Sequence, residues 1–202
     1  MDRRAALKLL AAGTAVSALS PQLFATFRRI HANLPQTPTL KILSAHQDAT
    51  VTAAAELLLP PTETPGAKAA RVNEFIDHIL ADWYSEEDRK RFLDGLSDMD
   101  SQSQKLFGKD FAVASPEQQA EVFQILGDEL ALALEALANA PPGYRGEAPE
   151  PENNFYVMFR ELTLTGYFTS EIGATQALHE VIIPGHFDGC TPLATSREQK
   201  GS

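Results

Sequence analysis

Three residues near the carboxyl end of the sequence carry side chains that commonly bind divalent metal ions. His179, Glu180 and His186 offer two imidazoles and one carboxylate within a short segment, and these groups are typical zinc ligands. The two histidines are seven positions apart, with Pro184-Gly185 between them, so they do not form the i, i+4 pair that a helix presents on one face. The segment is therefore either a metal site or, more simply, a hydrogen-bonded loop.

Cys190 is the one cysteine of the sequence, and it lies in the irregular segment 185–192. In an exported protein, an unpaired cysteine indicates a free thiol or a bond to another chain. The alternative is a buried, inert thiol. Asp77, His78 and Glu161 are further candidates for acid–base catalysis, but carboxylates scattered over helix faces are usually solvated.

The sequence lacks the motifs of the common cofactor enzymes. It has neither a G-x-G-x-x-G nor a Walker sequence for nucleotides, no G-x-S-x-G nucleophile motif, and too few cysteines for C-x-x-C-H haem attachment. Asp and Glu number 27 against 17 Lys and Arg, for a net charge of −10. This acidic balance argues against nucleic acid as a partner. We therefore expect no cofactor and no catalytic residue in this chain.

The first 18 residues have the character of an export signal. A charged start precedes an apolar stretch over 9–19 that shows no polar face of helical period. An ordinary amphipathic helix is the alternative. Paired arginines indicate the twin-arginine pathway, which carries proteins that are already folded. The residues that fit this signal are Arg3, Arg4, Leu7 and Lys8, whereas Ala6 stands where the motif has a bulky apolar residue.

The mature part of the chain reads as an all-α protein, an irregular helical bundle with long Pro/Gly-rich loops. We expect a linker over 19–46, a helical domain over 47–193 and a disordered tail over 194–202. Within the domain, capping residues and apolar periodicity predict helices over 47–59, 67–84, from 85 through about 96, 101–107, 116–139 and 154–165, with a loop over 140–152.

Several local signals are specific enough to test. Asp48 is the expected N-cap of the first of these helices, and Ser115 with Gln118 forms a capping box for the helix over 116–139. The inward face of helix 67–84 is expected to include Trp83. For the helix over 116–139, the expected inward residues are Val122, Phe123, Leu126, Leu130, Leu134 and Leu137.

Four segments in a fixed order, behind the signal, resemble the gluconate 2-dehydrogenase subunit 3 family. They are LPPTETPGA at 59–67, VNEFID at 72–77, GYFTSE at 166–171 and PGHFDGC at 184–190. The resemblance extends from the signal to about Leu193. It implies a small, non-catalytic subunit of a periplasmic sugar or polyol dehydrogenase, which helps the catalytic subunit to mature and lends its own signal to that subunit for export.

The same resemblance implies the partners. They are a large, FAD-dependent subunit of the glucose-methanol-choline oxidoreductase type, the twin-arginine translocation machinery and, in many complexes, a multihaem cytochrome c. The expected location is the periplasm, with association to the inner membrane through the complex as an option. We expect the partner to contact Cys190, Tyr167, Tyr156, Pro65 and Gly66; for the two tyrosines, a place in the chain's own core is the alternative.

Two other functions stay open from the sequence. One is a stand-alone periplasmic metalloenzyme that uses His179, Glu180 and His186. The other is a small sugar-binding module that recognises its ligand through Trp83 and the tyrosines.

Overall fold

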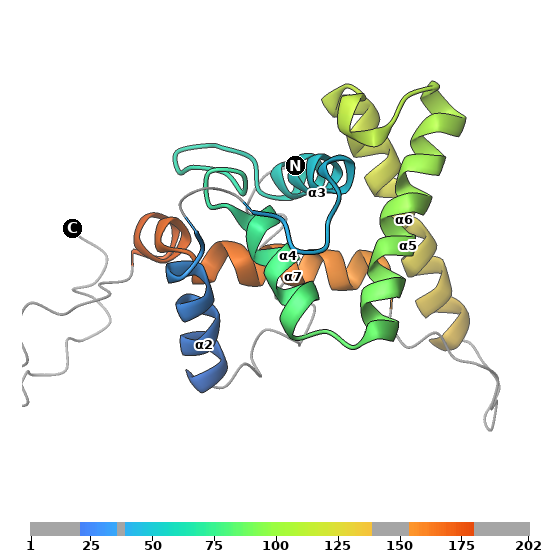
Figure 1. Cartoon of the computed structure of the whole chain (residues 1–202). Coiled ribbons are helices and arrows are strands. Elements are labelled where there is room, and N and C mark those ends of the chain that lie inside the picture. Colours follow the sequence, from blue (N-terminus) through green and yellow to red (C-terminus); the bar gives the residue numbers. More distant parts are fainter. Residues whose placement is uncertain (1–20, 36–38, 139–153, 180–202) are drawn as a thin grey trace, which may run out of the picture.

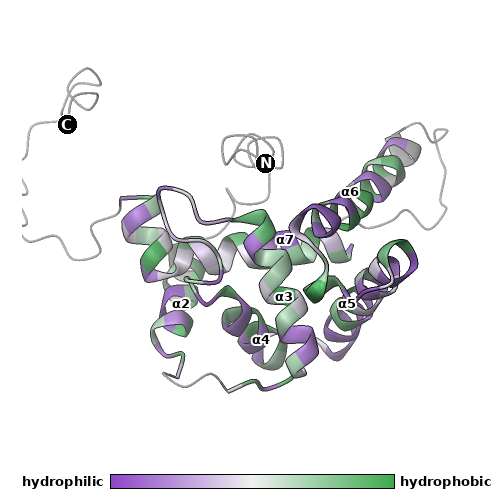
Figure 2. Cartoon of the chain, turned by 90° about the horizontal axis from the view of Figure 1, so that it is seen from above, coloured by the Kyte–Doolittle hydropathy of each residue, from purple (hydrophilic) through white to green (hydrophobic). Residues whose placement is uncertain are grey.

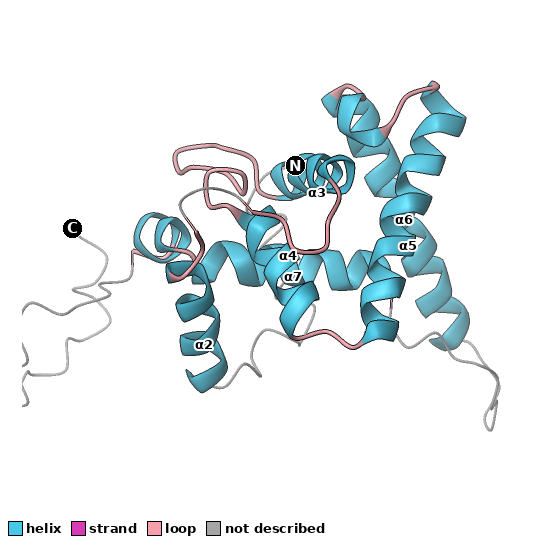
Figure 3. Ribbon diagram, viewed as in Figure 1, coloured by secondary structure: helices cyan, strands magenta, loops and turns pink. Residues whose placement is uncertain are grey.

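The computed structural model describes residues 21–35, 39–138 and 154–179, and all of their regular structure is helical (Figures 1 and 3). This confirms the all-α fold. Every helix in these ranges is too short or too polar to span a bilayer. In chain order, the elements are α2 (Pro21–Ala32), α3 (Ala45–Leu58), α4 (Val72–Asp82), α5 (Glu86–Phe107), the short 3-10 helix η2 (Phe111–Val113), α6 (Pro116–Ala138), α7 (Phe155–Thr169) and the π-helical turn η4 (Gly173–Ala177).

Helix α7 is the central element of the bundle, because it contacts each of the other described α-helices. It runs across the molecule behind α4, with α2 near one end and the α5–α6 pair near the other (Figure 1). The core around it is rich in aromatic rings, and burying one such ring contributes roughly 2–3 kcal/mol. The largest fully buried side chains include Tyr167, Phe75, Phe92, Phe111 and Phe159.

Two glycines allow α7 to approach its neighbours closely. A Cβ atom at Gly95 of α5 would lie 2.1 Å from Cγ of Phe155, and one at Gly166 of α7 would lie 2.7 Å from Cδ1 of Phe75. In each case an aromatic ring occupies the space that a larger residue would fill. The packing of these rings offsets the cost of about 1 kcal/mol that glycine imposes inside a helix.

Helix starts agree in part with the local signals. Ser115 and Gln118 form the expected capping box of α6, with Gln118 N–H donating to Ser115 Oγ and Ser115 N–H donating to Gln118 Oε1. Helix α3, however, begins behind Ser44, which pairs with Gln47 in a box of the same kind. Asp48 therefore lies inside the first turn and is not the N-cap; its carboxylate accepts a hydrogen bond from the Asn73 amide at 2.7 Å.

Other elements differ from the expectation because tertiary packing overrides local pattern. Residues 21–32 form α2, where we expected a linker, and this helix packs on α4 and α7. Helix α5 is continuous from Glu86 to Phe107, although we expected a break after about Leu96. Its buried stripe simply continues through Met99 and Ser103. Helix α4 starts at Val72 and not at 67, since Arg71 adopts a left-handed conformation with φ 55°.

The expected inward position of Trp83 is wrong. Asp82 is the last residue of α4, and the backbone of Trp83 has already left the helical conformation. The periodic stripe ends there, which leaves the indole 54% exposed. Leu134, which we also expected to face inward, is 39% exposed.

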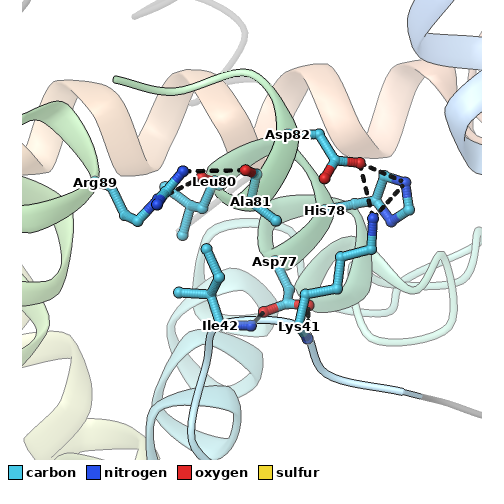
Figure 4. Close-up of polar contacts among 8 residues, drawn as sticks. All are labelled: Lys41, Ile42, Asp77, His78, Leu80, Ala81, Asp82 and Arg89. Atoms are coloured by element: carbon cyan, nitrogen blue, oxygen red, sulfur yellow. Dashed lines mark hydrogen bonds and ion pairs between the residues drawn. The ribbon is translucent and has the colours of Figure 1, made fainter. Parts of the chain in front are cut away.

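A buried carboxylate joins the chain before α3 to helix α4 (Figure 4). Asp77 accepts hydrogen bonds from three consecutive backbone N–H groups, those of Lys41 at 2.6 Å, Ile42 at 3.0 Å and Leu43 at 2.8 Å. At the end of the same helix, Arg89 of α5 donates to the carbonyl oxygens of Leu80 and Ala81. Polar side chains thus anchor both α4 connections.

We predict that Asp77→Ala lowers the free energy of unfolding by about 3 kcal/mol, because three backbone donors lose a charged acceptor in the protein interior. Asp77→Asn keeps one acceptor oxygen and should cost less. Asp82→Asn, on the same helix but at the surface, should cost less than about 1 kcal/mol. Urea unfolding of the four proteins measures the differences, and equal losses at positions 77 and 82 would contradict the role given to Asp77.

Candidate functional site

Most of the metal-like and export residues named from the sequence lie outside the described residues. These are Arg3, Arg4, Leu7, Lys8, Glu180, His186 and Cys190. His179 is described: it is exposed, follows η4 and has a left-handed backbone with φ 54°. The proposed grouping of His179 with Glu180 and His186 therefore stays a prediction.

Two of the residues expected at a partner interface have places inside this chain. Tyr167 is only 1% exposed, and its hydroxyl donates to the carbonyl oxygen of Pro65 at 2.8 Å. Gly66 is buried, and a Cβ atom there would lie 2.8 Å from the carbonyl oxygen of Leu59. Tyr167 thus takes the core role that the sequence left open for it, and Pro65 and Gly66 form the loop that covers its ring.

Tyr156 keeps part of its surface exposed in a groove between α5, α6 and α7. Its ring packs against Phe123 at a centroid distance of 5.1 Å and lies over Gly127 of α6. Burial raises the pKa of its hydroxyl. Tyr156 is therefore a half-buried support for α6, and its edge is accessible to another molecule.

The second half of α6 exposes leucines that a stable helix would normally bury. Leu132 is 67% exposed and Leu134 is 39% exposed, while Leu130 is half-buried. Between Glu129 and Glu135 every residue is Leu or Ala, so this part of the helix is apolar around its circumference, a pattern typical of helices that are covered. Figure 2 shows α6 running outwards along one edge of the molecule. We refer to Leu130, Leu132 and Leu134 as the distal α6 surface, which wraps around the helix, because Leu132 lies on the side opposite Leu130 and Leu134.

The acid–base candidates are engaged in structural contacts. The carboxylate of Asp77 is occupied by backbone N–H groups, as described above. His78 lies at the surface beside Lys41 and Asp82, with Nε2 3.3 Å from the Lys41 ammonium and 3.3 Å from the Asp82 carboxylate (Figure 4). The hydrogen bond from Lys41 lowers the pKa of Asp82. This cluster of charged and polar groups holds the segment before α3 against α4.

A basic groove lies between α2, α7 and the start of α4. Arg28, Arg29 and Arg71 contribute positive charge to its lining, which also includes His31 and the carboxylate of Glu171. Arg71 donates to both carboxylate oxygens of Glu74 and to the carbonyl oxygen of Pro35, which ties the chain after α2 to α4. In a chain with a net charge of −10, this groove is a local concentration of positive charge.

His31 anchors α2 within this groove. Its imidazole stacks on the ring of Phe75 at 4.6 Å with an interplanar angle of 2°. Burial lowers the pKa of His31 from 6.5 to about 4, against a smaller raising effect of the Gly166 backbone. The histidine is consequently neutral at physiological pH. The sequence analysis missed it, because it lies in the expected linker.

The sequence analysis also missed a cluster of His46, Asp100 and Asp110, in which the potential ligand atoms all lie within 4.8 Å of one another. These residues come from α3, α5 and the N-cap of η2, and no local spacing links them. Only the packing of α3 against α5 and η2 brings them together.

Comparison with known proteins gives one result. The family model described as Gluconate 2-dehydrogenase subunit 3 matches residues 45–185, a range that starts at the first residue of α3 and includes α7. Curated proteins and solved structures yield no match.

We predict that His31 makes stability fall as the pH is lowered from 6.5 to about 4. Over this range the unfolded chain binds a proton at this position while the folded chain does not, and a pKa displacement from 6.5 to about 4 corresponds to roughly 3 kcal/mol. His31→Phe keeps a ring on Phe75 and removes the titration, so its unfolding free energy should depend less steeply on pH.

The matched control is His179→Asn, which removes an exposed histidine and should leave the slope of the parent unchanged. Chemical unfolding at pH 4.5, 5.5 and 7 provides the comparison. A slope for His31→Phe equal to that of the parent would refute the assignment.

Proposed function

The chain belongs to the gluconate 2-dehydrogenase subunit 3 family, and on this premise we propose that it is the non-catalytic small subunit of a periplasmic, flavin-dependent sugar or polyol dehydrogenase. Family membership itself implies a small subunit of a dehydrogenase complex. The proposal adds that FAD resides in a large partner subunit of the glucose-methanol-choline type, and that a multihaem cytochrome c is a further possible subunit.

The observation that carries the accessory role is the family match over 45–185. The use of polar side chains within the described residues supports it. The carboxylate of Asp77 and the hydroxyl of Tyr167 both make hydrogen bonds that hold the chain together. The buried His31 is stacked on Phe75. These groups build a scaffold, and the chemistry of the complex then belongs to the partner.

We infer that the distal α6 surface is where the large subunit docks. Two of its leucines, Leu132 and Leu134, are exposed, and contact with a large flavoprotein would remove them from water at about 25 cal/mol per Å² of apolar area. The half-buried ring of Tyr156 packs beside Gly127, one turn before these leucines on the same helix. This aromatic contact would support the docking surface.

We further propose that the start of the chain directs export of the complex by the twin-arginine pathway. This route accepts folded cargo, which suits a partner that must acquire its flavin before it crosses the membrane. We propose that the translocation machinery recognises Arg3, Arg4, Leu7 and Lys8.

The export role is tested by co-expression with the large subunit. Arg3→Lys/Arg4→Lys should retain the flavoprotein in the cytoplasm, with periplasmic dehydrogenase activity falling at least tenfold. The chain has a second arginine pair, Arg28 and Arg29, within α2. Arg28→Lys/Arg29→Lys is therefore the matched control and should leave export unchanged. Equal export in all three strains would sink the export proposal.

The docking role is tested with Leu132→Gln/Leu134→Gln. Because these side chains are exposed in the isolated chain, its free energy of unfolding should change by less than about 1 kcal/mol, whereas the amount of flavoprotein that co-purifies should fall at least fivefold. Leu106→Gln replaces another exposed leucine, at the end of α5, and serves as the control. Dehydrogenase activity of the isolated chain would overturn the accessory role altogether.

A further inference from the structure

We propose that His46, Asp100 and Asp110 together bind one divalent transition-metal ion, and that Zn²⁺ is the ion that represents this class. The three residues bring one imidazole nitrogen and two carboxylate groups to a single place, where the potential ligand atoms all lie within 4.8 Å of one another. This set is separate from His179, Glu180 and His186, and it does not depend on the proposed function.

Each residue is positioned by a different element. His46 belongs to the first turn of α3, whose start is held by the Ser44–Gln47 capping box. Asp100 lies on α5, and its Oδ1 atom accepts the backbone N–H of Phe111 at 3.0 Å. Asp110 is the N-cap of η2, and its Oδ1 atom accepts the amide of Gln104 at 2.7 Å.

These hydrogen bonds orient the carboxylates towards the imidazole. With Oδ1 of Asp100 held by the Phe111 backbone, its Oδ2 lies 2.7 Å from Nε2 of His46. Hydrogen bonds of this kind, made by the atoms of a carboxylate that also faces a metal, fix ligand orientation in known sites. Both carboxylates are therefore oriented as metal ligands by hydrogen bonds to neighbouring groups.

The electrostatics favour a cation between the three groups. Two carboxylates this close to each other repel, and a divalent ion between them relieves the repulsion. The imidazole selects for zinc, nickel or copper over calcium and magnesium, which prefer all-oxygen ligands. Lys105 lines the same groove.

The site is open on one side, which suits an ion that completes its coordination with water. The His46 side chain is 50% exposed, and the groove in front of it also contains the polar side chains of Ser44, Ser97 and Ser101. A bound ion would join α3, α5 and η2 at the point where they meet, so its expected effect is to stabilise the fold.

Isothermal titration of the purified full chain with ZnCl₂ tests the proposal. We expect one equivalent of zinc to bind, and a rise in melting temperature that is absent with CaCl₂. His46→Gln and Asp110→Asn should each weaken zinc binding at least tenfold. His78→Gln removes a histidine that faces a single carboxylate and a lysine, so it is the matched control and should bind as the parent does.

Circular dichroism of each variant establishes that it is folded, and the two independent ligand variants guard against a local defect at either position. His179→Ala distinguishes this site from the one near the carboxyl end. The proposal is overturned if the parent binds no zinc at 100 µM, if His46→Gln and Asp110→Asn bind as tightly as the parent, or if His179→Ala abolishes binding.

Discussion

The buried carboxylate of Asp77 is the contact on which the first half of the fold depends. By accepting three consecutive backbone N–H groups, it fixes residues 41–43 against α4 and so determines where and in which direction α3 begins. Ser44 and Gln47 then close the first turn of α3. The position of His46, and with it the cluster near Asp100 and Asp110, follows from this one anchored segment.

In the second half of the fold, aromatic rings that pack against glycines position α7 against its neighbours. Phe155 fills the space over Gly95, and Phe75 fills the space over Gly166. His31 stacks on the ring of Phe75. These contacts set how α5, α4 and α2 cross α7. Because α7 touches all the other described α-helices, the whole bundle is organised around a helix whose own side chains are mostly buried.

Two kinds of surface on the described helices are accessible to other molecules. The distal α6 surface is apolar and carries two exposed leucines, whereas the groove beside α2 gathers three arginines in a chain whose net charge is −10. For a member of the gluconate 2-dehydrogenase subunit 3 family, a small scaffold with an uncovered apolar helix suits the role of a subunit that attaches to a larger body.

The sequence by itself determined the elements whose signals are local. The Ser115–Gln118 box located the start of α6, apolar periodicity identified the buried Val122 and Phe123 in its first half, and four ordered segments indicated the family. These features depend on residues a few positions apart, where capping and helical period act directly. The apolar pattern of the second half of α6 was misleading, because it predicted an inward Leu134 that is 39% exposed.

Tertiary structure decided whatever depends on contacts between distant segments. Helix α2 is stable where we expected a linker because His31 and Phe27 pack on Phe75. Tyr167 became a core residue through its hydrogen bond to Pro65, 102 positions away. His46 and Asp100 are 54 positions apart, so their meeting has no signature in sequence spacing; only the packing of three elements, which sums many weak contacts, could place them together.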